Sequence, residues 1–314
     1  MSVNNLAVVM ISGNESLHIE RAILNLKELT KNIFIVDSFS EDGTFELAQQ
    51  LGAVAVQRKW VNHSDQFQWA IDNCPFNVDW ILRMDVDELL DAELQKNIRA
   101  FVANPPEGVT GCILNRKHIF MGKWVRFGGR YPLPMVRLFK RGCAHVEQRW
   151  MDEHIVLEQG ASITLKGGFE DNNLNAVGWF IDKHNGYATR EMLDIKLKEI
   201  LPTSGSGISE NTGLAVRLKR WVKEGVYNRL PYFVRPALYF LYRYFIQFGF
   251  LDGARGFAYH FMQGFWYRAL VDLKCLEVDR LWANVTSVEQ KISVLEEYSG
   301  YDLSSYRMSA QDAS

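Results

Sequence analysis

Cysteine is scarce in this chain of 314 residues and is spread widely along it. No two of the four cysteines lie closer than 31 residues; they stand at Cys74, Cys112, Cys143 and Cys275. Such spacing excludes a CxxC redox motif and a compact zinc site. We therefore expect reduced, mostly buried thiols in a cytosolic protein.

Long apolar runs are also lacking, because no stretch reaches the roughly 20 residues that a membrane-spanning helix needs. The N-terminal run Leu6–Ile11 is too short for a signal peptide and has no basic flank, so we expect none. Excess charge is missing as well: the formal net charge of -2 argues against a general nucleic-acid binder. Apolar residues make up 47% of the chain, which predicts a sizeable core.

The near-neutral total conceals a segregation of charge. Between Thr212 and Lys274 the sequence has ten Lys or Arg residues and three acidic residues, a net charge of +7 for this block. The rest of the chain therefore carries a net charge of -9. The basic block is also dense in aromatic residues, which include Tyr239, Phe240, Trp266 and Tyr267.

Short apolar runs alternate with amphipathic stretches over the first 115 residues, which predicts a mostly parallel α/β sheet covered by helices on both faces. In such sheets ligands bind beyond the carboxyl ends of the strands. The helices are expected after Asn14, at Thr44–Leu51, around Phe67–Ile71 and at Leu94–Val102, and the strands at Leu6–Ile11, Ile33–Val36, Val54–Val56 and Trp80–Met84.

Three regions follow from the pattern. Residues 1–200 are predicted to form the catalytic α/β domain, with antiparallel strands added from Gly111 to about Leu165 and a helix over Asp171–Ile200. After the loop at 202–207, residues 212–300 are expected to form helices that pack or contact a membrane. The tail at 301–314 is expected to be disordered.

Asp85-Val86-Asp87-Glu88 is the sharpest motif. It follows an apolar strand, so the two aspartates can lie on the same side and hold a divalent cation through oxygen ligands. The alternative is that these acidic residues cap the next helix. In the segment 37–44, Asp37 suits recognition of a base or ribose, while Asp42 or Thr44 suits a helix cap.

Three segments together resemble the landmarks of family 2 glycosyltransferases: VVMISGNE (8–15), IVDSFSEDGT (35–44) and RMDVDE (83–88). The resemblance implies a GT-A (Rossmann-like) fold that binds a nucleotide-sugar, usually a UDP-sugar. It implies that Asp87 ligates Mg²⁺ or Mn²⁺ and that the nucleotide-sugar is lined by Ser12, Asn14, Glu15, Asp37 and Asp85. Arg58 and Gln66 are expected to complete this pocket.

An inverting transfer needs a general base for the acceptor hydroxyl. The resemblance places an acidic residue near Asp152 and Glu153, of which we favour Glu153; a solvated acidic turn is the alternative. Arg137 lies in a segment that resembles lipopolysaccharide-core and exopolysaccharide members of the family. It either meets a phosphate of the nucleotide-sugar or is a surface cation.

The basic and aromatic block at 217–274 suits peripheral contact with a membrane, because aromatic rings favour the headgroup depth and cations meet anionic lipid. Helices packed on the catalytic domain or on a dimer partner are the alternative. We predict an inverting, metal-dependent glycosyltransferase on the inner face of the cell membrane, acting on a lipid-linked or polysaccharide acceptor and not on nucleic acid. The competing hypotheses are a phosphatase of the haloacid dehalogenase type and an inactive membrane-docked scaffold.

Overall fold

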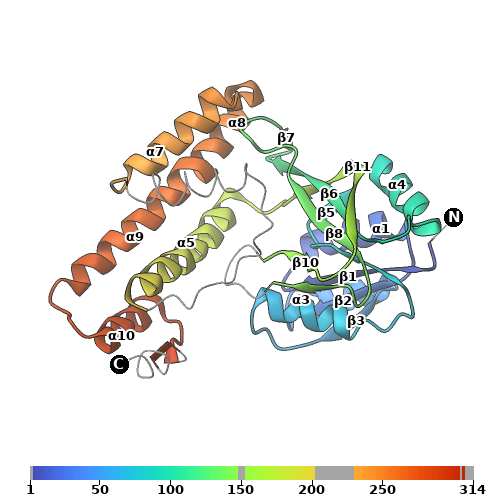
Figure 1. Ribbon diagram of the computed structural model, residues 1–314, viewed down its shortest axis with the longest axis horizontal. Coiled ribbons are helices and arrows are strands. Elements are labelled where there is room, and N and C mark those ends of the chain that lie inside the picture. Colours follow the sequence, from blue (N-terminus) through green and yellow to red (C-terminus); the bar gives the residue numbers. More distant parts are fainter. Residues whose placement is uncertain (1–2, 148–152, 202–229, 305, 308–314) are drawn as a thin grey trace. The chain divides into compact units, whose positions relative to one another are not determined.

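The computed structural model describes residues 3–147, 153–201, 230–304 and 306–307 (Figure 1). The chain divides into two compact units. One consists of residues up to Asn175 together with Gly249–Gly256, and the other takes the remainder. The boundary of the catalytic domain at residue 200 stays a prediction; the compact unit that contains the sheet takes residues up to Asn175 and Gly249–Gly256.

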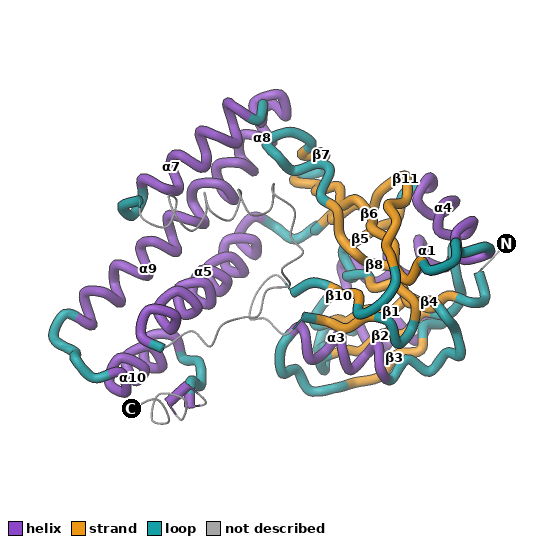
Figure 2. Tube along the Cα trace, viewed as in Figure 1, coloured by secondary structure: helices purple, strands orange, loops and turns teal. Residues whose placement is uncertain are grey.

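The first four strands build a parallel sheet in the order β3-β2-β1-β4 (Figure 2). Strands β1, β2 and β4 are largely apolar and buried along their whole length, whereas β3, at the edge of the sheet, is partly exposed. Ser12 pairs with Asp37, and Asp37 with Gln57, so these strand ends lie side by side. The elements are β1 (Leu6–Ser12), α1 (Ser16–Lys27), β2 (Ile33–Asp37), α2 (Thr44–Gln50), β3 (Val54–Gln57), α3 (His63–Asp72) and β4 (Trp80–Arg83).

Beyond β4 the sheet becomes mixed, in the order β4-β8-β6-β11-β5, with β7 paired to β6. Strand β8 is antiparallel to β4 and β6, as expected for later additions, while β11 runs parallel to β6. A separate two-stranded sheet joins β9 to β10. These elements are β5 (Glu88–Leu90), α4 (Ala92–Ala103), β6 (Val109–Phe120), β7 (Lys123–Val125), β8 (Pro134–Lys140), β9 (Ala144–Val146), β10 (Ile155–Leu157) and β11 (Ala161–Asn172).

The core of this unit has one layer on each face of the sheet. Alternate residues of β1 point to opposite faces, so Val8 packs with residues of α1 and α4 while Val9 packs with residues of α3. Cys74, Cys112 and Cys143 are buried free thiols in this unit, as expected for the cysteines. The α/β class with helices on both faces is confirmed.

The second unit is helical. Helices α5, α9 and α10 share a core in which buried residues of α9 recur every three or four positions, the spacing of one helix face. Leu303 packs into this core, and residues 308–314 of the predicted disordered tail lie outside the described residues. The helical elements are α5 (Val177–Ile200), α7 (Val234–Leu241), η3 (Tyr242–Ile246), η5 (His260–Trp266), α9 (Tyr267–Trp282) and α10 (Val288–Ser299).

A short segment, Gly249–Gly256, belongs to the first unit although the residues before and after it belong to the second. It comprises η4 (Gly249–Asp252) and the start of α8 (Gly253–Tyr259). The carboxylate of Asp252 is buried and accepts hydrogen bonds from the backbone N–H groups of Arg126 and Phe127, at 3.2 and 2.9 Å. A Cβ at Gly256 would lie 2.1 Å from the Asp252 Cβ, so this close approach requires glycine.

Candidate active site

The loops after β1 and β2 are joined through Asp37, which is fully buried. One carboxylate oxygen, Oδ2, accepts hydrogen bonds from the hydroxyls of Ser12 and Ser40, at 2.8 and 2.5 Å. The other, Oδ1, accepts from the backbone N–H of Ser40 at 2.8 Å. The adjacent strand ends thus bring Ser12 and Asp37 together, as the sequence predicted for residues that follow parallel strands.

Asn14 and Glu15 lie in the same pair of loops. The backbone N–H of Asn14 donates to the Ser40 hydroxyl at 2.8 Å, and the Asn14 side chain accepts from the N–H of Glu41 at 2.9 Å. The Glu15 carboxylate binds Nδ1 of buried His18 at 2.6 Å, and Nε2 of that ring accepts from the backbone N–H of Leu174 at 2.9 Å. Glu15 is therefore connected to the segment that follows β11.

Asp42 serves as the helix cap that the sequence suggested, because it accepts from the backbone N–H of Thr44, at the start of α2, at 3.1 Å, and it contacts a second helix as well. Its carboxylate accepts from the backbone N–H of Ser16, in the first turn of α1, at 2.9 Å. It also accepts from the Thr44 hydroxyl at 2.5 Å. Burial opposes ionisation, but these hydrogen bonds outweigh it and lower the pKa of Asp42 to about 2.

Arg58 and Gln66 meet beside this loop pair. Nη1 of Arg58 donates to the carboxylate of Asp65 and to Oε1 of Gln66, both at 2.6 Å. The amide of buried Gln66 donates to the Ser38 hydroxyl at 3.3 Å. The two side chains that we expected to complete the nucleotide pocket are thus linked to the residue directly after Asp37.

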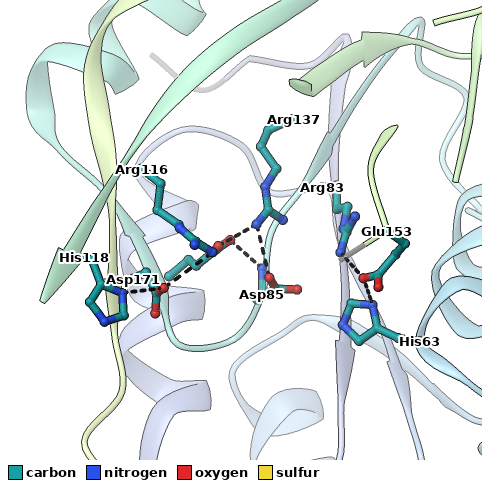
Figure 3. Close-up of polar contacts among 9 residues, drawn as sticks. His63, Arg83, Asp85, Arg116, His118, Arg137, Glu153 and Asp171 are labelled. Atoms are coloured by element: carbon teal, nitrogen blue, oxygen red, sulfur yellow. Dashed lines mark hydrogen bonds and ion pairs between the residues drawn. The ribbon is translucent and has the colours of Figure 1, made fainter. Parts of the chain in front are cut away.

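Asp85 lies at the centre of a charged cluster (Figure 3). Nη2 of Arg137 contacts Asp85 Oδ2 at 3.2 Å and Glu88 Oε1 at 2.7 Å, and the backbone N–H of Asp85 donates to Glu88 at 2.9 Å. Burial opposes ionisation of Asp85, but the charges of Arg137 and Arg83 outweigh it and lower its pKa. Burial raises the pKa of Glu88 well above its ordinary value, although Arg137 opposes this shift.

Asp87 faces the segment that follows β11. Its Oδ2 accepts from the amide of Asn173 at 3.0 Å, and its backbone carbonyl accepts from the N–H of Asn172 at 3.0 Å. Among the described residues, no group of three or more His, Cys, Asp or Glu side chains converges as a metal site. The Asp87 carboxylate is an oxygen ligand of the kind that a hard divalent cation takes.

Glu153 is held in a second cluster. Its carboxylate lies 3.1 Å from Nη2 of Arg83 and also contacts Nδ1 of His63 (Figure 3). Burial opposes ionisation, but the hydrogen bond from His63 and the neighbouring Arg83 outweigh it, so the pKa of Glu153 is lowered. The alternative base, Asp152, lies outside the described residues.

The sequence did not single out a third cluster, on β11 and β6. Asp171 accepts from Nδ1 of His118 at 3.0 Å and pairs with Arg116 at 3.6 Å. In the sheet, Asp171 stands opposite both Glu88 and His118, so these side chains form a row across β5, β11 and β6. Burial opposes the shift, but His118 lowers the pKa of Asp171.

Several known proteins with similar sequences are named as glycosyltransferases. Residues 7–144 match the sequence profile of the family described as Glycosyl transferase family 2. An uncharacterized glycosyltransferase of Rickettsia conorii is 36% identical over 99 residues, which are 32% of this chain and 34% of that protein. One of Rickettsia bellii is 37% identical over 99 residues, 32% of this chain and 33% of that protein. The matches thus span about a third of each relative.

Solved structures resemble the chain at lower similarity. Glucosyl-3-phosphoglycerate synthase from Mycobacterium tuberculosis, in complex with Mn²⁺ and UDP-glucose, is 16% identical and covers 65% of this chain and 82% of its own, with a TM-score of 0.41. Mannosyl-3-phosphoglycerate synthase from Rubrobacter xylanophilus is 16% identical over 66% of this chain and 79% of its own, with a TM-score of 0.40. By its sequence profile and its landmarks, the N-terminal part of this chain, residues 7–144, is similar to glycosyl transferase family 2.

Proposed function

We propose that this chain is an inverting, metal-dependent glycosyltransferase that moves a sugar from a nucleotide-sugar, UDP-linked by our expectation, to a glycan or lipid-linked acceptor. One observation carries the proposal. The neighbouring strands β2, β1 and β4 end at one edge of the sheet and there present Asp37, Ser12 and the Asp85–Asp87 motif. This edge is where α/β sheets bind their ligands.

The nucleotide is assigned to the loops after β1 and β2. Asp37 is fully buried and accepts three hydrogen bonds from Ser12 and Ser40, so it holds together the two loops that would contact the base or ribose. Arg58 and Gln66 border the same loops through Ser38. Since Asn14 and Glu15 are tied to the β2 loop and to His18, we assign them to shaping this pocket.

Asp87 is assigned to the metal. Its carboxylate would hold Mg²⁺ or Mn²⁺, which supplies positive charge to the departing diphosphate. Asn173 donates to Asp87 and so fixes the orientation of that carboxylate. Asp85 is oriented by Arg137, with Glu88 behind it, which keeps Asp85 ionised at the edge where the sugar is expected.

The acceptor proton is assigned to Glu153 or Asp152. The Glu153 carboxylate can accept a proton, although its lowered pKa makes it a weaker base than an ordinary glutamate. The acceptor oxygen would attack the anomeric carbon as the bond from that carbon to the diphosphate oxygen breaks. Arg83 and His63 hold the Glu153 carboxylate in place, so both act as positioning residues.

Membrane contact is assigned to the helical unit. Among the described residues, no helix is long and apolar enough to cross a bilayer. One face of α7 and η3 is nevertheless apolar and exposed, with side-chain positions spaced like a single helix stripe. The exposed members are Val234, Leu238, Leu241, Tyr242, Phe245 and Ile246.

The ten basic residues of this region differ in their surroundings: Arg255 is exposed, and Arg268 and Lys274 are half-buried. Arg235 pairs with buried Asp272, and Arg243 is itself buried, so neither supplies charge to a lipid surface. Arg217, Lys219, Arg220, Lys223 and Arg229 lie outside the described residues. The apolar stripe, with exposed Arg255, is what supports peripheral attachment to the inner face of the cell membrane, near a lipid-linked acceptor.

The test is a panel of nucleotide-sugars with and without Mn²⁺ or Mg²⁺, in which release of the nucleoside diphosphate is measured. Metal-dependent release from one donor is the expected result. Asp37→Asn should weaken binding of UDP, whereas Asp72→Asn, at the far end of α3, is the matched control. Release that is equally fast in a chelator would contradict the metal assignment.

A further inference from the structure

A cavity of about 230 Å³ lies beside the carboxyl end of β4. Arg83, Arg137 and Glu153 are among its polar lining residues, and apolar side chains such as Ile113, Val136 and Ile155 form most of its wall. Among the described residues that line it, none comes from the loops after β1 and β2. The cavity is therefore separate from the loops to which the nucleotide is assigned.

Both guanidinium groups at this cavity are almost completely buried. The Arg137 side chain is 2% exposed and that of Arg83 is 4% exposed. Nη2 of Arg137 is engaged by Asp85 and Glu88, but its Nε and Nη1 have no hydrogen-bond partner among the described residues. The same holds for Nε of Arg83. Buried donors are rarely left unpaired, so these three nitrogens call for an acceptor.

The two arginines are also close enough to repel each other. Burial and, after it, the charge of Arg137 lower the pKa of Arg83. Figure 3 shows the two side chains entering the site from neighbouring positions, with Glu153 on the far side of Arg83. An anion between them would remove both the repulsion and the unsatisfied donors.

The size and the donors of the cavity indicate the kind of anion. A volume of about 230 Å³ exceeds that of several water molecules, since each takes about 30 Å³ in the liquid. A carboxylate is satisfied by one planar guanidinium, whereas a phosphate offers oxygens in several directions to donors from two arginines. The apolar wall leaves room for carbon atoms attached to the phosphate.

We propose that this cavity binds a phosphate group carried by the acceptor, an inference that rests on the proposed transferase function. Glu153, one of the two residues assigned to the acceptor proton, lines the same cavity. The unpaired nitrogens of Arg137 are those not engaged by Asp85. A phosphate held here would anchor the acceptor while its hydroxyl reaches the sugar at Asp85.

The first test is titration of the full chain with inorganic phosphate in a calorimeter. Arg83→Gln should weaken phosphate binding by about tenfold or more, because a charge-assisted hydrogen bond is lost. Ile113→Phe, which fills the cavity and keeps both arginines, should weaken it similarly. Lys140→Gln removes a positive charge from an exposed position on β8 and should leave binding unchanged. If Arg83→Gln fails to fold, Ile113→Phe decides; unchanged binding in that variant refutes the proposal.

A second set of titrations separates the sources of phosphate. With UDP at saturation, the affinity for inorganic phosphate should change less than twofold. Competition between UDP and phosphate would assign the cavity to the donor and overturn the proposal, as would tighter binding of acetate than of phosphate. Failure of UDP to bind the wild-type chain at all would refute the transferase assignment instead, because that site is formed by the loops around Asp37.

Discussion

Replacement of Arg137 by methionine tests whether the centre of the site is held by a buried ion pair. Methionine keeps much of the side-chain length but leaves Glu88 and Asp85 without their cation. Removing one partner of a buried pair costs about 3–5 kcal/mol. A typical domain unfolds with about 5–15 kcal/mol, so the variant should be close to the limit of stability.

The penalty should also depend on pH. The folded-state pKa of Glu88 is already raised, and loss of Arg137 raises it further because burial is no longer opposed. The folded state then binds more protons than the unfolded state, so stability falls as the pH rises from the unfolded-state pKa through the folded-state pKa. Arg137→Met should therefore lose more stability at pH 8 than at pH 5.

The assay is urea unfolding followed by tryptophan fluorescence, for the wild type, Arg137→Met, Glu88→Gln and the double variant. The double variant should be more stable than Arg137→Met alone at pH 8, because no uncompensated carboxylate is buried at residue 88. It should also lose most of the pH dependence. A loss below about 1 kcal/mol in Arg137→Met, or no rescue by Glu88→Gln, would refute the reasoning.

Three further predictions follow. Asp87→Ala should lower metal-dependent release of nucleoside diphosphate by about 10²–10³-fold without loss of folding, measured by coupled assay and circular dichroism; full activity in this variant would exclude Asp87 as the ligand. Asp42→Asn should remove at most about 1 kcal/mol of stability, since Asp42 is exposed. In the wild type that stability should be lost as the pH falls from 4 toward the pKa of about 2. Acid unfolding that is identical in the wild type and the variant would contradict this prediction. Phe245→Glu with Ile246→Glu should reduce binding to anionic liposomes in flotation, whereas Leu24→Glu on α1, 50% exposed, should not; equal loss in both would mean a nonspecific effect.

The alternating strands and helices of the first 115 residues were predictable, because buried parallel strands are continuous apolar runs. The position of the polar residues at one edge also followed, since parallel strands end together. In the site, the motif at 85–88 and the segment 37–44 were recognisable from their place after a strand. The helix cap by Asp42 was predicted for α2, and the structure shows that Asp42 also accepts from the first turn of α1.

Long-range pairing could not be predicted. Glu88 meets Arg137 across 49 positions, and Asp171 meets His118 across 53. Nothing in the local sequence distinguishes a buried arginine from a surface cation, and for Arg137 both alternatives remained open. The same limit applies to Arg235 and Arg243, which were counted toward a basic surface. Arg235 pairs with Asp272, and Arg243 is buried. The net charge of a segment gives no information on which of its charged side chains form ion pairs.

The contact of Asp252 with the backbone of Arg126 and Phe127 limits where the chain can be cut to make stable fragments. A fragment that stops after β11 would retain every strand and helix of the sheet, yet it would lack the carboxylate that pairs with those two N–H groups. Transplanting the unit that contains the sheet onto another C-terminal region would have the same defect unless that region supplied an equivalent aspartate. The eight residues from Gly249 to Gly256 should therefore be kept with the sheet in any chimera, although more than 70 positions of sequence separate them from it.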